Sequence, residues 1–420
     1  MQLIFHGAAR EVGRSCVEVA SEKRFLFDAG IKITAEQPEH PTHIDDLRGI
    51  AGVFLSHGHL DHCGALPLLD HTGLRCPIFC TSATKAITRI LLKDALKIER
   101  IKHHHPAYDK NDVFKALDSV QKVRYGQKNY LEGIEFAFQD AGHIPGSASI
   151  MVEVEGKRIL YTGDINTTQT MLLKGAFVNF PKINTLICES TYGEKDHPER
   201  KKEEKAFLSK VKEISDTGSV ILPVFAVGRA QEVMMMLAKK DFSVPIYMDG
   251  MAKSVTELFE QEPGFIRDVS LLQKSAEKVE FIESRDEREE ALKKKGIFLT
   301  TSGMLSGGPV IKYLTELGDN PNNGILLTGY QTEDSNGRLL LEEGRVIIDN
   351  KLIKINSQVK QFDFSAHAGM RELKELVRKI MPEHAIFVHG DKSATLSMAK
   401  FAESLGIKAC APKTDEILEV

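Results

Sequence analysis

The stretch that decides the fold spans residues 54–62 and reads Phe54-Leu55-Ser56-His57-Gly58-His59-Leu60-Asp61-His62. It continues an apolar run that begins at Val53 and is typical of a buried strand. Three histidines and one aspartate then follow within six positions, with the spacing H-x-H-x-D-H. Imidazole and carboxylate groups are ligands for divalent metals, and for zinc in particular. The alternative is a solvated histidine-rich loop, which is disfavoured because four ligand side chains gather directly behind one strand.

Within this motif, the positions of the side chains indicate more than one metal ion. Gly58 is expected to allow a tight turn that points His57 and His59 at the same ion. Asp61 and His62 precede an expected helix over residues 64–69 and can serve a second ion beside the first. The motif therefore predicts a two-metal centre.

Length and charge restrict the class of protein. A chain of 420 residues is long for one compact domain, and two domains are expected. The net charge of −4 excludes a protein coated in positive potential, so any contact with nucleic acid would come from a local groove. The polar N-terminus and the absence of a long apolar run predict a soluble, cytoplasmic protein.

Three other acidic or imidazole side chains follow expected strands. Asp28 comes after the strand 25–27 and is either a turn former or a carboxylate that orients a ligand histidine. His143 and Asp164 lie in loops at strand ends, where side chains are held rigidly enough to bind a metal. Asp164 could bridge both ions through its two oxygens.

The pattern changes after residue 193. Lys and Glu recur at helical spacing over residues 194–216, which is typical of a charged surface helix. Strands then alternate with helices, which indicates a parallel sheet with helical crossovers. We therefore expect an α/β protein in which a separate domain, residues 194–365, is inserted between residues 1–193 and 366–420 of the first domain.

Taken together, these residues resemble the metallo-β-lactamase superfamily, and within it the β-CASP branch of nucleic-acid-processing nucleases. The chain is similar to the ribonuclease group that includes the endonuclease subunit of the eukaryotic cleavage and polyadenylation specificity factor and its short archaeal and bacterial homologues. The resemblance covers the whole chain. It rests on Asp28, the motif at 57–62, His143, Asp164, Glu189 in Glu-Ser-Thr-Tyr-Gly, His367 in Ser-Ala-His-Ala and His389 in Val-His-Gly. It implies a metallo-β-lactamase αββα sandwich with an inserted β-CASP parallel-sheet domain.

The resemblance also implies the cofactor and its ligands. Two Zn²⁺ per chain are expected, one held by His57, His59, His143 and Asp164, and the other by Asp61, His62, Asp164 and His389. RNA is the expected substrate because a histidine such as His389 accompanies RNA-acting members of the branch, whereas DNA-acting members tend to carry valine. The expected products have 5′-phosphate and 3′-hydroxyl ends. Endonuclease action is expected, with 5′→3′ exonuclease activity left open.

Phosphodiester cleavage also needs proton transfers. Asp61 is expected to accept the proton of the attacking water as well as to bind metal. Protonation of the alkoxide leaving group is assigned to His367, and Glu189 is expected to hold its tautomer and raise its pKa. Candidates for phosphate contact are Arg229, Ser302, Arg338 and Ser365.

Two rival functions remain open. One is a metallohydrolase of small esters or thioesters on the same fold, and the other is an inactive RNA-binding scaffold. The expected partner is single-stranded RNA, with no membrane contact and with a homodimer as a candidate assembly. Metal content near two ions per chain would favour the enzyme over the scaffold.

Overall fold

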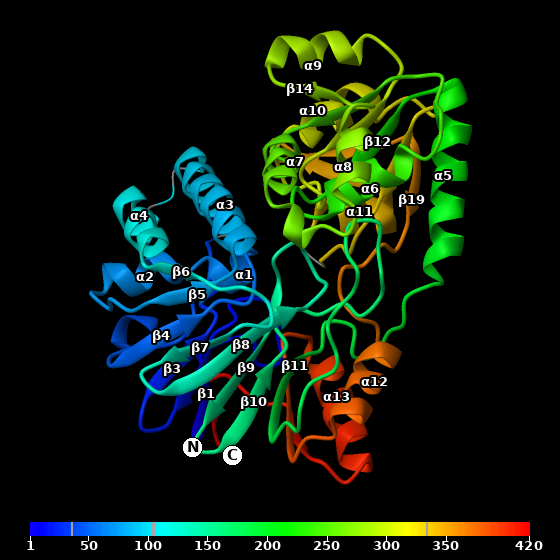
Figure 1. Ribbon diagram of the computed structural model, residues 1–420. Helices are drawn as coiled ribbons and strands as arrows, with labels where there is room; N and C mark the ends of the chain where they lie inside the picture. Colours follow the sequence, from blue (N-terminus) through cyan, green and yellow to red (C-terminus); the bar gives the residue numbers. More distant parts are fainter. Residues whose placement is uncertain (35–36, 103, 105, 333–334) are drawn as a thin grey trace. The chain divides into compact units, whose positions relative to one another are not determined.

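The computed structural model describes residues 1–34, 37–102, 104, 106–332 and 335–420. The chain forms two compact units (Figure 1). Unit 1 comprises Met1–Gln169, Lys174–Asp196 and His367–Val420, and unit 2 comprises Thr170–Leu173 and His197–Ala366. The domain boundaries expected at residues 193/194 and 365/366 stay predictions.

Among the described residues, unit 1 contains two mixed sheets of seven strands each. The first sheet contains, in spatial order, β22 (Ile417–Glu419), β1 (Gln2–Phe5), β2 (Val17–Ala20), β3 (Arg24–Phe27), β4 (Ile50–Phe54), β5 (Ile78–Cys80) and β6 (Val120–Lys122). The second contains β21 (Lys408–Cys410), β20 (His384–Val388), β11 (Thr185–Glu189), β10 (Lys157–Tyr161), β9 (Ala148–Val154), β8 (Ile134–Asp140) and β7 (Lys128–Leu131).

Aromatic side chains fill the space between these two sheets. Phe27 of β3 stacks on Tyr161 of β10 with ring centroids 4.8 Å apart, and Phe54 of β4 lies 4.7 Å from Phe136 of β8. All four belong to one buried cluster that draws on both sheets. Large rings contribute most to such a core because they bury the most apolar area. Successive side chains of a strand point to opposite faces, so one set of each strand's apolar residues faces this core and the other set faces away from it.

Helices cover the outer face of each sheet (Figure 1). The first sheet is covered by the 3-10 turn η1 (Ile44–Asp46), α1 (Leu60–Cys63), α2 (Leu66–His71), α3 (Ser82–Ile101) and α4 (Lys110–Asp118). The second is covered by α12 (Met370–Ile380) and α13 (Lys392–Ser404). This confirms the expected αββα order. The helix expected at 64–69 is α2, which begins at Leu66, and a separate short helix, α1, precedes it at Leu60–Cys63.

Unit 2 is built on a parallel sheet, which confirms the expected architecture of the insertion. The sheet contains, in spatial order, β14 (Glu280–Ile282), β13 (Ile246–Asp249), β15 (Ile297–Thr300), β12 (Val220–Pro223), β16 (Gly324–Leu327) and β19 (Gln358–Gln361). Its other elements are α5 (Arg200–Thr217), α6 (Arg229–Leu237), α7 (Ala252–Gln261), η2 (Pro263–Phe265), α8 (Val269–Ala276), α9 (Arg285–Leu292), α10 (Val310–Leu317), α11 (Asn336–Glu343) and the hairpin β17 (Arg345–Ile348) and β18 (Lys351–Lys354). No helix in the described ranges is long and apolar enough to cross a membrane.

Candidate metal centre

The strand ends of unit 1 bring the predicted site residues together. Strands β10, β11 and β20 are parallel neighbours, so their carboxyl ends lie at one edge of the second sheet. Asp164, Glu189 and His389 occur at or just after these ends. In the first sheet, β3 and β4 are also parallel and end before Asp28 and the 57–62 motif. Residues far apart in sequence therefore meet because their strands end on the same side.

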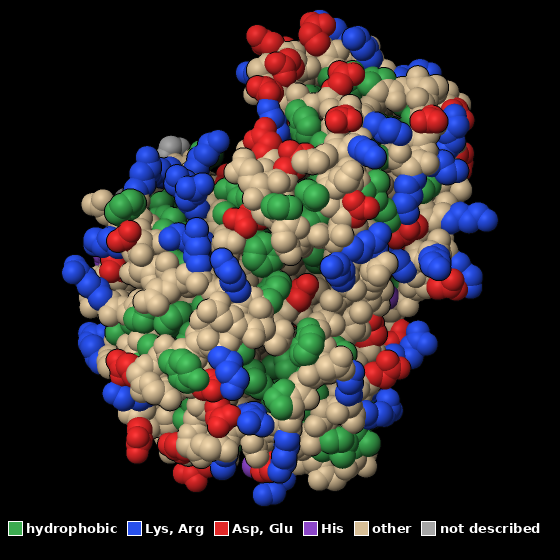
Figure 2. All heavy atoms as spheres, viewed as in Figure 1, with side chains coloured by type: hydrophobic (Ala, Val, Ile, Leu, Met, Phe, Trp, Pro, Cys, Tyr) green, Lys and Arg blue, Asp and Glu red, His purple; other side chains and the backbone are tan. Residues whose placement is uncertain are grey.

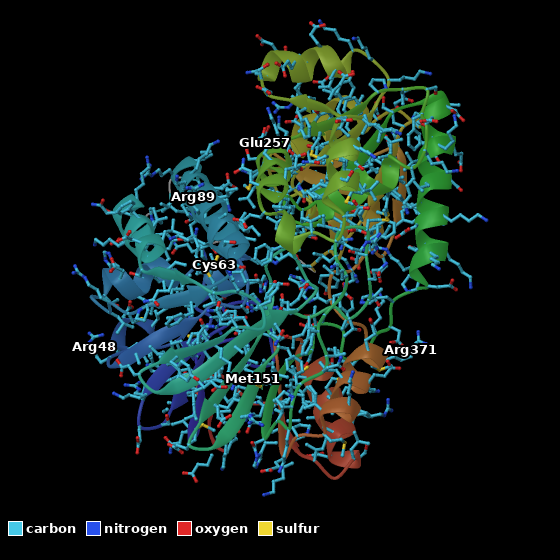
Figure 3. The ribbon with its side chains drawn as sticks, in the orientation of Figure 1. Arg48, Cys63, Arg89, Met151, Glu257 and Arg371 are labelled. Carbon is cyan, nitrogen blue, oxygen red and sulfur yellow. The ribbon has the colours of Figure 1, made fainter. Side chains whose placement is uncertain are left out.

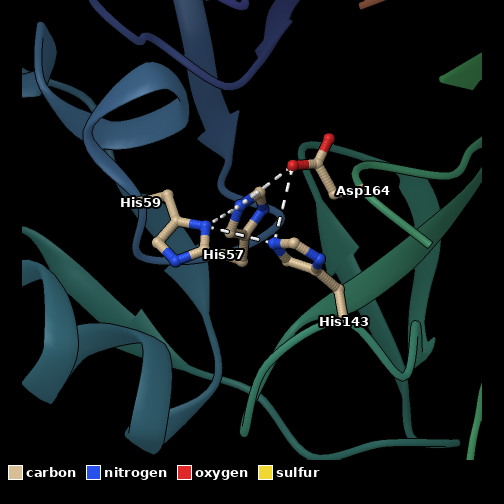
Figure 4. Close-up of side chains that lie close together, drawn as sticks. All are labelled: His57, His59, His143 and Asp164. Atoms are coloured by element: carbon tan, nitrogen blue, oxygen red, sulfur yellow. Dashed lines mark hydrogen bonds and ion pairs between the residues drawn. The ribbon is translucent and has the colours of Figure 1, made fainter. Parts of the chain in front are cut away.

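The first group of candidate ligands comprises His57, His59, His143 and Asp164 (Figure 4), and one ligand atom from each lies within 4.8 Å of all the others. Oδ2 of Asp164 is 3.5 Å from His57 Nε2 and 3.6 Å from His143 Nε2. His59 approaches these two rings with Nδ1, at 3.2 Å from His57 Nε2 and 3.1 Å from His143 Nε2. The arrangement offers three nitrogens and one oxygen to a single point.

The second group comprises Asp61, His62, Asp164 and His389, again within 4.8 Å of one another. Oδ1 of Asp164 is 3.3 Å from His62 Nε2 and 3.6 Å from His389 Nε2. Asp61 Oδ2 lies 3.6 Å from the same nitrogen of His389. Asp164 thus presents Oδ2 to the first group and Oδ1 to the second, as expected for a bridging carboxylate.

The electrostatics of the cluster fit bound cations. Among the described residues, the buried atoms Asp164 Oδ1 and His62 Nε2 form no hydrogen bond, and such atoms are costly unless something satisfies them. Burial opposes the charge of Asp164, but His389, His62 and His367 hold the pKa of its carboxyl well below the usual range. Burial, reinforced by His62, holds the pKa of His57 well below its usual value. For His57 this gives a neutral imidazole beside an ionised carboxylate, the state in which both bind a divalent metal. For His62, burial is outweighed by the charges of Asp164 and Asp28, which raise its pKa well above the usual value, so metal binding there would displace a proton.

Asp28 lies behind this cluster and holds His62. Its carboxylate accepts hydrogen bonds from Ser56 N at 2.6 Å, Ser56 Oγ at 2.7 Å and Tyr161 Oη at 2.8 Å, and its Oδ2 is 2.7 Å from His62 Nδ1. The Nδ1 contact leaves His62 Nε2 to face the second group. Asp28 adopts a left-handed backbone with φ of 59°, an uncommon conformation that aspartate tolerates better than most residues. The geometry matches a carboxylate that orients a ligand.

Three further side chains orient the cluster and were missed by the sequence reasoning. Besides Tyr161, Ser56 Oγ lies 3.0 Å from His57 Nδ1, and Ser15 Oγ lies 2.9 Å from His389 Nδ1. Both hydroxyls contact the nitrogen that faces away from the ligand groups. Ser56 could have been found because it directly precedes His57. Ser15 and Tyr161 carry no comparable local signal.

Glu189 and His367 form a third group with Asp164, beside the first group. His367 Nδ1 is 3.0 and 3.2 Å from the two carboxylate oxygens of Glu189, although the residues are 178 positions apart. Glu189 also accepts from the backbone amides of Ile165 and Thr191, which fixes its carboxylate. The His367 ring centroid is 4.6 Å from that of His143. Burial alone would lower the pKa of His367, but the charges of Glu189 and Asp164 outweigh it and raise the pKa to about 9.

Gly58 is required for a different reason from the one expected. It is not among the glycines with a left-handed backbone. Instead, a Cβ at this position would lie 2.7 Å from Ile87 Cγ2 of α3. The absence of a side chain at Gly58 therefore lets the metal loop pack against α3.

The predicted phosphate-contact residues all lie in unit 2. Ser302 follows β15, Arg229 begins α6, and Arg338 on α11 pairs with Glu342 at 2.5 Å. The Ser365 amide donates to Asp363 Oδ1 at 3.1 Å. Their contact with a phosphate stays a prediction.

Comparisons with known proteins agree with this geometry. A metallo-beta-lactamase superfamily domain matches residues 17–190, a Beta-Casp domain matches 230–340, and a Zn-dependent metallo-hydrolase RNA specificity domain matches 352–412. "Probable RNase MJ4" of Methanocaldococcus jannaschii is 42% identical over the full length of both chains. "RNase aCSPSF2" of Saccharolobus solfataricus is 36% identical over 98% of this chain and 83% of its own.

More distant matches extend these similarities. "Cleavage and polyadenylation specificity factor subunit 3" of Dictyostelium discoideum is 32% identical over 96% of this chain and 54% of its own length. A crystal structure of a protein of unknown function from Enterococcus faecalis shares the fold, with a TM-score of 0.63 at 13% identity over 99% of each chain. The three matching domains and the full-length relatives together show that the chain belongs to the β-CASP branch of the metallo-β-lactamase superfamily.

Proposed function

We propose that this protein is a metal-dependent ribonuclease that hydrolyses internal phosphodiester bonds of single-stranded RNA in RNA processing or decay. The observation that carries the proposal is the Glu189–His367 pair beside the two ligand groups, because phosphodiester hydrolysis needs both metal chemistry and a proton donor. The relatives that are named as RNases support the choice of substrate.

Two Zn²⁺ per chain are the proposed cofactor. The ligands would be His57, His59, His143 and Asp164 for one ion, and Asp61, His62, Asp164 and His389 for the other. A set of imidazoles and carboxylates suits zinc, and the matching RNA specificity domain is described as Zn-dependent. When bound, such ions polarise the phosphate and lower the pKa of water to about 7.

The side chains of the protein would perform the remaining steps. The oxygen of water attacks phosphorus, the bond from phosphorus to the 3′-oxygen breaks, and a 5′-phosphate and a 3′-hydroxyl result. Asp61, whose side chain is 32% exposed, would accept the proton of the water. His367 would donate a proton to the 3′-oxygen, a role typically worth about 10²–10⁴ in rate. Glu189 would keep Nδ1 of His367 protonated and thereby orient the imidazole ring.

Neither rival function uses all of these features. A thioester or small ester has a better leaving group than a ribose alkoxide, so it does not need the His367–Glu189 pair in the same way. An inactive scaffold does not need two complete ligand groups. Contacts of Arg229, Ser302, Arg338 and Ser365 with substrate phosphates, and assembly as a homodimer, remain part of the proposal.

The test compares an internally labelled single-stranded RNA with a DNA of the same sequence. Wild-type protein, His367→Ala, a chelated sample and the control variant His43→Ala are incubated with each, and metal content is measured in parallel. We expect internal RNA fragments from the wild type and the control, and a loss of about 10²–10⁴ in rate for His367→Ala. Progressive release of mononucleotides would replace endonuclease by 5′→3′ exonuclease action. Intact RNA in a wild-type sample that holds two metal ions per chain would overturn the proposal.

A further inference from the structure

Helix α3 carries a row of cationic side chains on its exposed face. Lys85, Arg89, Lys93 and Lys97 recur every fourth residue, and Arg100 and Lys102 continue the row. Lys85 is half-buried and the others are exposed. Figure 2 shows Lys and Arg side chains gathered over α3, and Figure 3 labels Arg89 on this helix. Because a helix rises about 1.5 Å per residue, the members that are four residues apart are about 6 Å apart along its axis.

In the described ranges, these six side chains have no close ionic partner. Within the described part of the chain, none of them forms an ion pair or a side-chain hydrogen bond. Of the two carboxylates on α3, Glu99 is bound to His104 at 3.1 Å, and Asp94 is half-buried and attracts Lys97 only from beyond ion-pair distance. Like charges four residues apart destabilise a helix, so the row is not explained by the stability of α3.

On the other charged helices, most basic side chains are paired, although Lys201 and Lys205 of α5 form no ion pair within the described residues. On α5, Lys210 pairs with Glu213 at 2.6 Å and Lys212 with Asp216 at 2.5 Å, while Lys202 pairs with Glu199 just before the helix. On α9, Arg285 pairs with Glu289 and Lys293 with Glu290. In a protein whose net charge is −4, the unpaired row on α3 is a local concentration of positive potential.

The row begins beside the candidate metal centre. Ile87, in the first turns of α3, fills the space that a Cβ at Gly58 would occupy, and Gly58 lies between His57 and His59. The hydroxyls of Thr81 and Thr84 lie 2.8 and 2.9 Å from the carbonyl oxygen of Gly146, in the loop that follows His143. Lys85 therefore stands next to residues that pack on both ligand loops, and the later members lie progressively farther along the helix.

We propose that this row is a track for the backbone of single-stranded RNA, along which the strand is held as it leaves the metal centre. The inference rests on the proposed ribonuclease function and adds where the strand runs on unit 1. Exposed lysines and arginines bind phosphates without reading sequence, and a row of them follows successive phosphates of an extended strand. The track predicts salt-dependent binding of RNA that is long enough to cover both the metal centre and α3.

The test uses two triple variants that remove the same charge. One carries Arg89→Ala, Lys93→Ala and Lys97→Ala on α3, and the matched control carries Lys202→Ala, Lys210→Ala and Lys212→Ala at the paired positions of α5. Lys85 is kept because it lies close to the ligand loops. Alanine favours helix, so both variants are expected to fold. Binding of a long single-stranded RNA is measured at several salt concentrations with metal-loaded protein, and His367→Ala is added to each to slow cleavage.

Loss of three phosphate contacts should weaken RNA binding by about ten- to a hundredfold at 0.1 M salt and reduce the slope of log Kd against log salt by about 2. The α5 control should match the protein that carries only His367→Ala, in RNA affinity and in the salt slope. Equal slopes in the α3 variant and the parent would overturn the track. An equal loss of binding to polyglutamate would also overturn it, because α3 would then be a general anion surface. Cleavage by the wild type is scored separately, so failure of the track and failure of the ribonuclease function are distinguishable.

Discussion

Glu189 sets the protonation state of His367, because its carboxylate is the nearest charge to a ring that burial would otherwise keep neutral. His367 can donate a proton only while it is protonated. Its contribution to the rate is therefore present below its pKa and is lost as the pH rises through about 9. Glu189→Gln removes the charge that raises the pKa of His367, so burial then lowers this pKa. We therefore expect the alkaline limb of the kcat profile to move to lower pH by about one unit or more.

The matched control for this pH profile is Glu153→Gln, which removes an equal charge from a carboxylate paired with Arg158 at the surface. Its alkaline limb should coincide with that of the wild type. An unshifted limb in Glu189→Gln, at normal metal content, would mean that another group donates the proton.

Asp28 offers a second prediction for a single residue. Asp28→Asn keeps the shape and tolerates φ of 59°, but it removes the charge that faces His62 Nδ1 and the hydroxyls of Ser56 and Tyr161. Loss of such an orienting carboxylate typically lowers metal affinity by about 10–100-fold. Competition with a coloured chelator measures it. Tyr161→Phe removes one of these donors and should lose less metal affinity than Asp28→Asn. Equal metal affinity in Asp28→Asn and the wild type would contradict the orienting role of Asp28.

How far these residues could be predicted depends on how local their signals are. The sequence alone identifies four of the ligands, because their side chains follow one strand: His57, His59, Asp61 and His62. Ser15 and its contact with His389 could not be found in this way, since the two are 374 residues apart and meet only when the sheets have formed. Glu189 and His367 were assigned from the family resemblance, because nothing in the local pattern of either residue points to the other.

At the scale of elements, Glu232 on α6 joins three segments of unit 2. Its carboxylate accepts from the amides of Met171 and Leu172 at 2.8 Å each and pairs with Arg200 of α5 at 2.6 Å. Glu232→Ala would leave two buried amides and a half-buried guanidinium without this partner. We expect unit 2 to lose about 2–5 kcal/mol in its free energy of unfolding. Urea unfolding and exchange of the Met171 and Leu172 amides measure the loss.

Glu204→Ala is the control for this effect. Glu204 also pairs with Arg200, at 2.8 Å, whereas the amides of Met171 and Leu172 donate to Glu232. Its removal should cost less and should leave the exchange of those amides unchanged. Equal destabilisation by the two variants would assign the effect to Arg200 alone.

Element types were predictable where the apolar pattern was continuous. The apolar runs at 25–27, 185–188 and 220–225 predict strands, and the structure forms β3, β11 and β12 there, with β12 ending two residues early at Pro223. The break between α1 and α2 was not predictable from periodicity. It follows from packing at Gly64, where a Cβ would lie 2.5 Å from Leu60 O and 2.7 Å from Ile31 Cγ1.

For the whole molecule, the sequence predicted an α/β protein with an inserted parallel-sheet domain, because the change from strand-rich to alternating pattern is long and regular. It did not predict that Thr170–Leu173 leaves the surrounding segments of unit 1 and joins unit 2. This segment is held by Glu232, which accepts a hydrogen bond from the Leu172 amide. The two residues are 60 positions apart, so no local sequence pattern indicates the contact.

Metal removal should affect the two units differently. All candidate ligands and Asp28 lie in unit 1, whereas the core of unit 2 is an apolar cluster around Phe298 and Tyr313. Bound metal stabilises the unit that holds it by about 2.7 kcal/mol when free metal exceeds Kd a hundredfold. Chelation should therefore speed amide exchange around residues 57–62 and 164, while β12 and β15 keep their protection.

Addition of Zn²⁺ should restore the protection. The effect should saturate at two equivalents of Zn²⁺, since Asp164 presents one oxygen to each of the two ligand groups. Saturation at one equivalent would contradict the two-metal assignment, and equal loss of protection in both units would show that the metal supports more than the unit whose side chains hold it.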